Sequence, residues 1–334
     1  MKVAVIGTTS WGTTQAIMLS RRGFEVSMWA RTEAEARRLR ADRQNSRMMP
    51  GFPFPDGLLV TASAASALRG AAMVIFAVPS QSLRENVKAV GKHIGGAMIV
   101  LSGVKGLEVG SRKRMSEVIA DELPISLHNN IAVLSGPNLA LEIARGLPAA
   151  SVIAARHEDV ARNAQQIMMS PSFRVYTSDD VVGVELGGAL KNIIALGAGM
   201  SDGMGYGDNA KAGFMTRGLA EISRLGVAMG AKPLTLAGLA GLGDLVATCS
   251  SSLSRNHFLG CELAKGRSLD EVTSSMKGVA EGITTTAAAR QMAHCMGIGM
   301  PITEQIYRVL FEGLGLRQAI TELMGREPKP ETSR

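Results

Sequence analysis

Hydrophobic positions in the first half of the chain form short continuous runs that alternate with helical patterns. Such runs are typical of parallel strands buried on both faces, where no face is left for polar residues. Helical patterns lie between them at about 11–22, 33–41 and 158–169. The predicted strands are 2–7, 25–30, 58–62, 73–78, 98–102 and 131–136, with 150–155 and 173–178 expected to extend the sheet. This alternation predicts a doubly wound, mostly parallel sheet.

From about residue 180 the pattern becomes helical throughout. The stretch 180–200 is long, apolar and rich in small residues, which predicts a buried helix, and 211–230 predicts a second. Further helices run to about Met324, and the polar, proline-bearing end is expected to fray. We therefore expect an α/β fold in which an N-terminal Rossmann-like domain precedes a C-terminal all-helical domain, with the site between them. The expected bounds are 1–180, 181–324 and, for the tail, 325–334.

The turn after the first strand has the spacing of a dinucleotide-binding turn with one exception. Gly7 and Gly12 occupy the first and third glycine positions of G-x-G-x-x-G, and Thr9 occupies the second. Gly7 suits the tight turn and Gly12 suits close packing of the helix, whereas the second glycine normally lets backbone approach the pyrophosphate. The pyrophosphate can still bind the helix N-terminus, and we expect the Thr9 hydroxyl to donate a hydrogen bond to it. Thr9 therefore bears on cofactor affinity.

The end of the second strand bears on the choice of cofactor. Arg31 stands where an acid would bind a ribose 2′-hydroxyl and favour NAD. Its guanidinium suits a 2′-phosphate instead. We expect NADP to be accepted and leave NAD open. A plain solvated helix face explains the arginines that follow, which are Arg37, Arg38, Arg40, Arg43 and Arg47.

The charge and residue composition of the chain limit the kinds of partner that it is expected to bind. The net charge of +7 suits anionic partners, but with only 4% aromatic residues and no aromatic-interleaved basic run, no nucleic-acid binding is expected. Cys249, Cys261 and Cys295 match no metal motif, which predicts reduced thiols in a cytoplasmic protein. A strand begins at once, leaving no room for a signal peptide, and the apolar stretches are broken short of a membrane span. We therefore expect no membrane insertion.

Two lysines and one polar segment are candidates for chemistry. Lys191 lies inside the apolar run 180–200, where a charged, unpaired amine is unfavourable and snorkelling from a helix end is disfavoured. Burial favours the neutral amine that acid–base catalysis uses. Lys105 follows the fifth strand, at the edge where ligands bind, and would polarise a carbonyl. The segment 252–256, SLSRN, suits a phosphate, although a plain helix N-cap explains it equally well.

Six segments together carry a family resemblance. They are SWGT at 10–13, SGVKG at 102–106, SGPNLALE at 135–142, ELGGALKNIIALGAGM at 185–200, GLGDLVATCSSSLSRN at 241–256 and GVAEG at 278–282. In this order and spacing the chain resembles NAD(P)-dependent sn-glycerol-3-phosphate dehydrogenases, to about residue 320. The resemblance implies reversible reduction of dihydroxyacetone phosphate to sn-glycerol 3-phosphate, with NADP(H) and/or NAD(H). It also implies a role in phospholipid synthesis and a homodimer.

The resemblance assigns roles to individual residues. It implies that Lys191 donates the proton in ketone reduction and accepts it in alcohol oxidation, and that Asp244 binds substrate, where it would accept a hydrogen bond from a substrate hydroxyl or orient a lysine. No metal is expected, because the nicotinamide carries the redox chemistry. The implied substrate-binding residues are Lys105, Gly136, Asn138, Lys191, Asp244, Ser254, Arg255 and Asn256. With the turn and the second strand included, the expected cofactor-binding residues are Gly7, Thr9, Ser10, Trp11, Gly12, Arg31, Met48, Lys105, Ala140, Arg255, Val279 and Glu281.

The chain also departs from the family pattern. Asn138 replaces a small hydroxyl residue and Leu139 a phenylalanine, while Met48 and Met49 replace an aromatic–aliphatic pair. The methionines and Thr9 bear on cofactor affinity, and Asn138 bears on substrate contacts. Two alternatives stay open: a non-catalytic NADP(H)-sensing binding protein, and a related two-domain reductase acting on a hydroxy acid.

Overall fold

Eight strands form one sheet in the order β3-β2-β1-β4-β5-β6-β7-β8 in this computed structural model, which describes residues 1–328 and 330–331. The strands are β1 (Lys2–Ile6), β2 (Glu25–Trp29), β3 (Leu58–Thr61), β4 (Ala71–Phe76), β5 (Ile99–Ser102), β6 (Ile131–Ser135), β7 (Ala149–Ala155) and β8 (Phe173–Ser178). All neighbouring pairs are parallel except β6 and β7, which are antiparallel. The predicted doubly wound, mostly parallel sheet is confirmed, including its extension by the last two strands.

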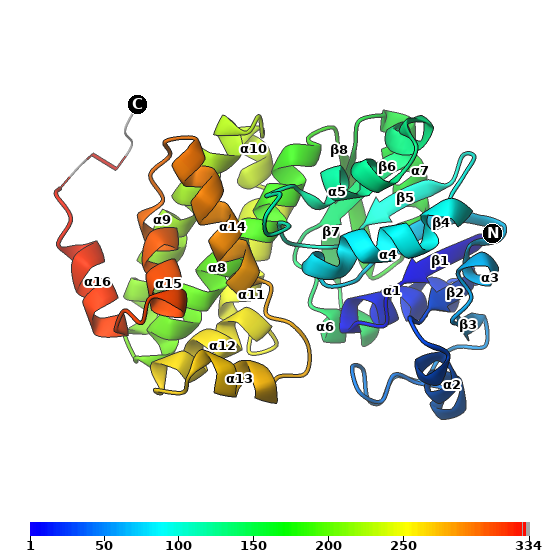
Figure 1. The fold of residues 1–334 in the computed structure, drawn as a ribbon, viewed down its shortest axis with the longest axis horizontal. Coiled ribbons are helices and arrows are strands. Elements are labelled where there is room, and N and C mark those ends of the chain that lie inside the picture. Colours follow the sequence, from blue (N-terminus) through cyan, green and yellow to red (C-terminus); the bar gives the residue numbers. More distant parts are fainter. Residues whose placement is uncertain (329, 332–334) are drawn as a thin grey trace.

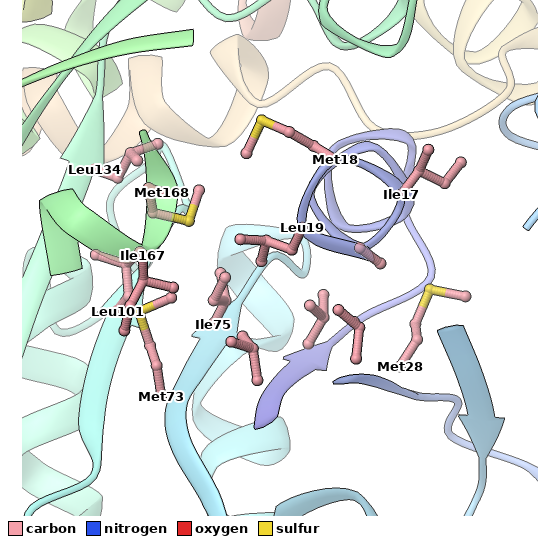
Figure 2. Close-up of a cluster of buried hydrophobic side chains, with 14 of the residues drawn as sticks. Ile17, Met18, Leu19, Met28, Met73, Ile75, Leu101, Leu134, Ile167 and Met168 are labelled. Carbon is pink, nitrogen blue, oxygen red and sulfur yellow. The ribbon is translucent and has the colours of Figure 1, made fainter. Parts of the chain in front are cut away.

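Helices cover both faces of this sheet (Figure 1). Along β1 and β4, Val5 and Ile75 pack on one face with Leu19 of α1, whereas Ile6 and Phe76 pack on the other face. Figure 2 shows the first of these clusters, where side chains from α1 and α7 meet the sheet. Burial on both faces explains why the strands read as continuous apolar runs. The helices are α1 (Ser10–Arg21), α2 (Glu33–Asp42), α3 (Ala64–Leu68), α4 (Leu83–Val90), α5 (Met115–Glu122), α6 (Ala140–Ala144) and α7 (Glu158–Met168), with short 3-10 turns η1 (Ser80–Ser82), η2 (Gly91–His93) and η3 (Ile125–Asn130).

The remainder of the described chain is helical, as predicted. The central helix α8 (Val181–Gly203) contacts α9, α11, α12, α14 and α15 (Figure 1). The other elements are α9 (Gly207–Ala228), α10 (Pro233–Leu236), the π-helical turn η4 (Leu239–Gly243), α11 (Asp244–Ser250), α12 (Arg255–Ala264), α13 (Leu269–Ser275), α14 (Gly282–Cys295), α15 (Pro301–Phe311) and α16 (Leu316–Met324). The predicted polar tail lies partly outside the described residues, because 329 and 332–334 are not among them.

The expectation that every apolar stretch falls short of a membrane span is wrong. Helix α8 has 23 residues and is long and apolar enough to cross a membrane. By length and composition alone, the segment Pro233–Ser250 is also long and apolar enough. However, 83% of the most apolar part of α8 is buried inside the protein. Its neighbours supply the apolar surroundings, so α8 is the core helix of the helical part.

The sheet topology fixes where a ligand can bind. Strand β1 lies between β2 and β4, so the chain leaves β1 toward one side of the sheet and returns on the other. In open α/β sheets this switch point leaves a crevice at the carboxyl ends of the strands. Helix α1 begins at that end of β1, and its N-terminus therefore points into the crevice.

Candidate active site

A cavity of about 440 Å³ lies at this crevice, between the ends of β1, β4 and β5 and the helical part. It brings together most of the predicted residues, although Gly7, Gly12, Arg31, Gly136 and Asp244 do not line it. A larger cavity, of about 730 Å³, lies among α8, α9, α15 and α16 and contains none of them. The predicted residues that line the smaller cavity are Thr9, Ser10, Trp11, Met48, Lys105, Asn138, Ala140, Lys191, Ser254, Arg255, Asn256, Val279 and Glu281.

Both glycines of the turn are required by the geometry. Gly7 has a φ of +116°, and a Cβ added there would lie 2.8 Å from the Ala77 carbonyl oxygen. A Cβ at Gly12 would lie 2.3 Å from the Gly7 carbonyl oxygen. Both distances are too short for a side chain. The turn therefore needs Gly7 for its backbone conformation and Gly12 for close packing of α1, the two reasons inferred from the sequence.

Thr9 has a different role from the one expected. Its Oγ1 donates to the Ala77 carbonyl oxygen at 2.6 Å and accepts from the Gly12 amide at 3.0 Å, which makes Thr9 the N-cap of α1. The hydroxyl proton is therefore already engaged, and the expectation that it points at a pyrophosphate is wrong for this structure. The amides of Ser10 and Trp11 have no protein partner among the described residues and remain available to an anion.

Residues that the sequence analysis missed hold this turn from outside. Asn45 Nδ2 donates to the Thr8 carbonyl oxygen at 2.8 Å and to Thr13 Oγ1 at 2.9 Å. Thr8 Oγ1 donates to Glu35 Oε1 at 2.6 Å. Asn45 lies in an irregular loop and carried no sequence signal, whereas Glu35 belongs to the charged helix that was interpreted as a solvated face. Arg31 lies where predicted, two residues after the end of β2, and is exposed.

The two predicted lysines share one buried carboxylate. Asp244 Oδ1 lies 2.6 Å from Lys191 Nζ, and Asp244 Oδ2 lies 2.6 Å from Lys105 Nζ. The Asp244 side chain is 1% exposed. Lys191 is therefore ion-paired, which avoids the unfavourable burial of a charged, unpaired amine that the sequence analysis considered. Of the two roles considered for Asp244, the structure has the one in which it orients lysines.

Local structure explains how Asp244 reaches the lysines. It begins α11 directly after η4, and α8 approaches η4 so closely that a Cβ at Gly187 would lie 2.6 Å from the Ala240 carbonyl oxygen. Lys191 Nζ also donates to Thr248 Oγ1, one helical turn beyond Asp244. Thr248 was not predicted, although its spacing of four residues from Asp244 places both on one helix face.

The surroundings of Lys105 change its acidity. Burial lowers its pKa to about 8, the charge of Asp244 opposes this shift, and the nearby charge of Lys191 adds to it. Lys105 Nζ also donates to the Gly136 carbonyl oxygen at 2.7 Å, which is how Gly136 takes part in the site without lining the cavity. An amine with this pKa exchanges its proton close to neutral pH.

Residues at the start of α12 face the cavity from the helical side. Ser254 is the N-cap of α12 and accepts from the His257 amide at 3.2 Å, so the N-cap and cavity-lining interpretations hold together. Asn256 is engaged by protein groups: its Nδ2 donates to Asn192 Oδ1 and its Oδ1 accepts from the Gly282 amide, each at 2.9 Å. Asn256 therefore fixes the start of α14 against α8.

Glu281 connects the two walls of the cavity, and Arg255 lines the cavity from the helical part. The Arg255 guanidinium keeps solvent contact but is crowded by the loop at Gly278, where an added Cβ would lie 2.5 Å from Nη1. Burial lowers its pKa, and the charge of Glu281 opposes this. Glu281 accepts from the Ser80 amide at 2.9 Å and from the Ser80 hydroxyl, which ties the helical part to the loop after β4. Burial raises the Glu281 pKa, against the Ser80 hydrogen bonds.

Asn138 presents an unused donor at the cavity. Its Oδ1 accepts from Ser151 Oγ at 2.6 Å, whereas its Nδ2 is buried and has no partner among the described residues. Ser151 thus fixes which end of the amide is engaged. The departure from a small hydroxyl residue leaves an N–H donor at the wall that the substrate was expected to contact.

The site combines the elements of hydride-transfer chemistry. A helix N-terminus with open amides suits a pyrophosphate, and two buried ammonium groups on one carboxylate suit a carbonyl that gains negative charge. Within residues 1–328 and 330–331 no group of three or more His, Cys, Asp or Glu side chains could hold a metal ion. Fold and site together define a dinucleotide-dependent oxidoreductase of two-domain build.

Comparison with known proteins gives the family. The family described as NAD-dependent glycerol-3-phosphate dehydrogenase matches with its N-terminal part at residues 2–161 and with its C-terminal part at 180–321, and the chain belongs to this family. A glycerol-3-phosphate dehydrogenase [NAD(P)+] of Dehalococcoides mccartyi is 53% identical over 99% of this chain and 92% of its own length. One from Anaeromyxobacter dehalogenans is 48% identical over 99% of this chain and 100% of its own length. The crystal structure of the Coxiella burnetii glycerol-3-phosphate dehydrogenase is 37% identical, with a TM-score of 0.92 over 97% of this chain and 99% of that one.

These matches establish the activity that the resemblance implied. The chain is an oxidoreductase that catalyses reversible NAD(P)H-dependent reduction of dihydroxyacetone phosphate to sn-glycerol 3-phosphate, in glycerophospholipid metabolism. A ketopantoate reductase from Ralstonia eutropha, 18% identical with a TM-score of 0.60, shares the fold alone. The family match therefore favours the dehydrogenase over the hydroxy-acid reductase that the sequence left open.

Proposed function

We propose that Lys191 is the general acid of ketone reduction and, in the reverse direction, the general base of alcohol oxidation. The observation that carries this is the buried ion pair with Asp244, which holds the Lys191 amine at the cavity wall and compensates its charge. The bound nicotinamide supplies the hydride. Lys191 Nζ then gives its proton to the substrate oxygen as charge develops there, and Lys105, on the same carboxylate, stabilises that charge.

The cofactor and the phosphate are proposed to bind at two helix N-termini. The open amides of Ser10 and Trp11 at α1 suit the pyrophosphate, and Gly7 and Gly12 allow the tight turn and the close packing of α1 that position these amides. The substrate phosphate is proposed to bind at the start of α12, where the Arg255 guanidinium and the helix N-terminus face the cavity together. This places the substrate carbonyl between the phosphate site and the lysine pair.

Lys191→Ala tests the assignment. We expect NADPH oxidation on addition of dihydroxyacetone phosphate to be abolished, while the dissociation constant for NADPH stays near that of the wild type. Wild-type-like turnover would refute the role of Lys191. A wild-type protein that binds NADPH without turning over would instead support the non-catalytic sensor.

We further propose a cytoplasmic homodimer whose chain is divided into units at 1–180 and 181–324. The match to the N-terminal part of the family ends at residue 161 and the match to the C-terminal part begins at residue 180, which supports the division. The three cysteines are free thiols, which supports the compartment. Sedimentation equilibrium tests the dimer, and limited proteolysis near residue 180 tests the division.

A further inference from the structure

Helix α2 places a carboxylate against the nucleotide turn. Glu35 Oε1 accepts from Thr8 Oγ1 at 2.6 Å, and Thr8 is the residue between the first glycine and Thr9. The helix N-cap Thr32 accepts from the Glu35 amide at 3.2 Å, which fixes Glu35 in the first turn of α2. Glu35 is therefore half-buried and bound to the turn, and it does not belong to the solvated face of α2.

The second oxygen of this carboxylate is free for a ligand. In the part of the chain that the structure describes, Glu35 Oε2 has no hydrogen-bond partner and no lysine or arginine within ion-pair distance. Glu33, on the same helix, is different, because its carboxylate pairs with Arg40. Its side chain is also more exposed, at 54%. A role in solvating the surface of α2 therefore does not explain the position of Glu35.

Through Thr8, Glu35 lies beside the turn from which the adenosine half of a dinucleotide is expected to extend. Thr9 and Ser10 of the turn line the cavity, and in dinucleotide-binding folds of this kind the adenosine ribose extends from the turn toward the end of the second strand. Arg31 occupies the position after β2 from which an acid usually binds the ribose hydroxyls, and Glu35 follows four residues later, in the first turn of α2. A carboxylate accepts hydrogen bonds from ribose hydroxyls and repels a 2′-phosphate, whereas a guanidinium attracts that phosphate.

We propose that Glu35 binds the adenosine ribose and raises the specificity of this enzyme for NADH relative to NADPH, with Thr8 as its positioning residue and Arg31 acting in the opposite direction. The proposal rests on the cofactor site described under the proposed function. It accounts for the joint occurrence of a hydroxyl at Thr8 and a carboxylate at Glu35, which are 27 residues apart in the chain.

The test compares kcat/KM for NADH and for NADPH at saturating dihydroxyacetone phosphate. Glu35→Gln keeps an acceptor for Thr8 but removes the charge. We expect the ratio of kcat/KM for NADPH to kcat/KM for NADH to rise roughly tenfold. Thr8→Val should move the ratio in the same direction by roughly threefold, through KM and not kcat. Arg31→Gln should lower the ratio. Glu33→Gln, which removes a charge from the same helix, is the matched control and should leave it unchanged.

Two outcomes would overturn the proposal: an unchanged ratio in Glu35→Gln, or an equal loss with both cofactors, which would indicate a purely structural role. Dissociation constants from the fluorescence of NADH and NADPH give the same ratio without catalysis. If the proposed catalytic roles were wrong but this proposal right, the enzyme would show no turnover. The ratio of the dissociation constants for NADPH and NADH would still differ between Glu35→Gln and the wild type.

Discussion

Lys191 and Asp244 form an ion pair, with 2.6 Å between Nζ and Oδ1, across 53 residues of chain and at the wall of the cavity. The same carboxylate binds Lys105 through its other oxygen. Two buried cations on one anion leave a net positive charge in the site, which suits a substrate that becomes negatively charged at its carbonyl oxygen.

Asp244→Asn is expected to damage both stability and catalysis. It leaves two buried ammonium groups without their counter-charge, so the free energy of unfolding should fall by roughly 3 kcal/mol. Because the amines are then no longer held in place, kcat should fall by about 100-fold. Urea denaturation and steady-state assays measure the two effects. Thr248→Val, which removes only one hydrogen-bond acceptor of Lys191, is the milder control, and a wild-type kcat in Asp244→Asn would contradict the positioning role.

Lys105 should make stability rise with pH. Its pKa is about 8 in the folded protein and 10.5 ordinarily, so between these values the unfolded chain binds more protons than the folded one. The free energy of unfolding therefore increases with pH in this window, by at most about 1.4 kcal/mol per pH unit, and the gain is absent below about pH 8, where both states are protonated. Denaturation of wild type and Lys105→Met across the window isolates the effect. Parallel curves would show that Lys105 titrates normally.

Arg255→Ala should weaken substrate binding in particular. The guanidinium faces the cavity at the start of α12, where a doubly charged phosphate would gain charge-assisted hydrogen bonds. We expect the KM for dihydroxyacetone phosphate to rise roughly 10- to 100-fold. Lys265→Ala, at the exposed other end of α12, is the matched control. An unchanged KM would place the phosphate elsewhere.

Thr9→Gly should change cofactor binding more than catalysis. The Thr9 hydroxyl is used within the turn, so its removal takes no donor from the pyrophosphate, while loss of the side chain lets the backbone approach the ligand. We expect a lower dissociation constant for NADPH with kcat within about twofold, and a stability loss of a few tenths of a kcal/mol from the weaker cap. Isothermal titration and thermal unfolding measure these. A larger change in kcat than in affinity would show that Thr9 acts on the reacting end of the cofactor.

Much of the site could be identified from the sequence because its residues stand in local patterns. Gly7 and Gly12 occur at a fixed spacing between a strand and a helix, and Lys191 is a charge inside an apolar run. Glu35 and Asn45 could not be found in this way. Their partner is the turn, which lies 27 or more residues away in the chain and beside them only after β1, β2 and α2 have packed.

The sequence by itself determined the eight strands, the helical second half, the nucleotide turn and the two lysines, because burial periodicity and turn chemistry act between near neighbours in the chain. Only the tertiary structure decided the antiparallel pairing of β6 with β7, the engagement of the Thr9 hydroxyl, and the hydrogen bond that Ser80 donates to Glu281 across 201 residues. It also decided that Asp244 joins Lys105 and Lys191, which are 139 and 53 residues away from it. These contacts depend on which helix faces approach closely, such as α8 against η4 at Gly187, and the packing of the whole chain sets that approach.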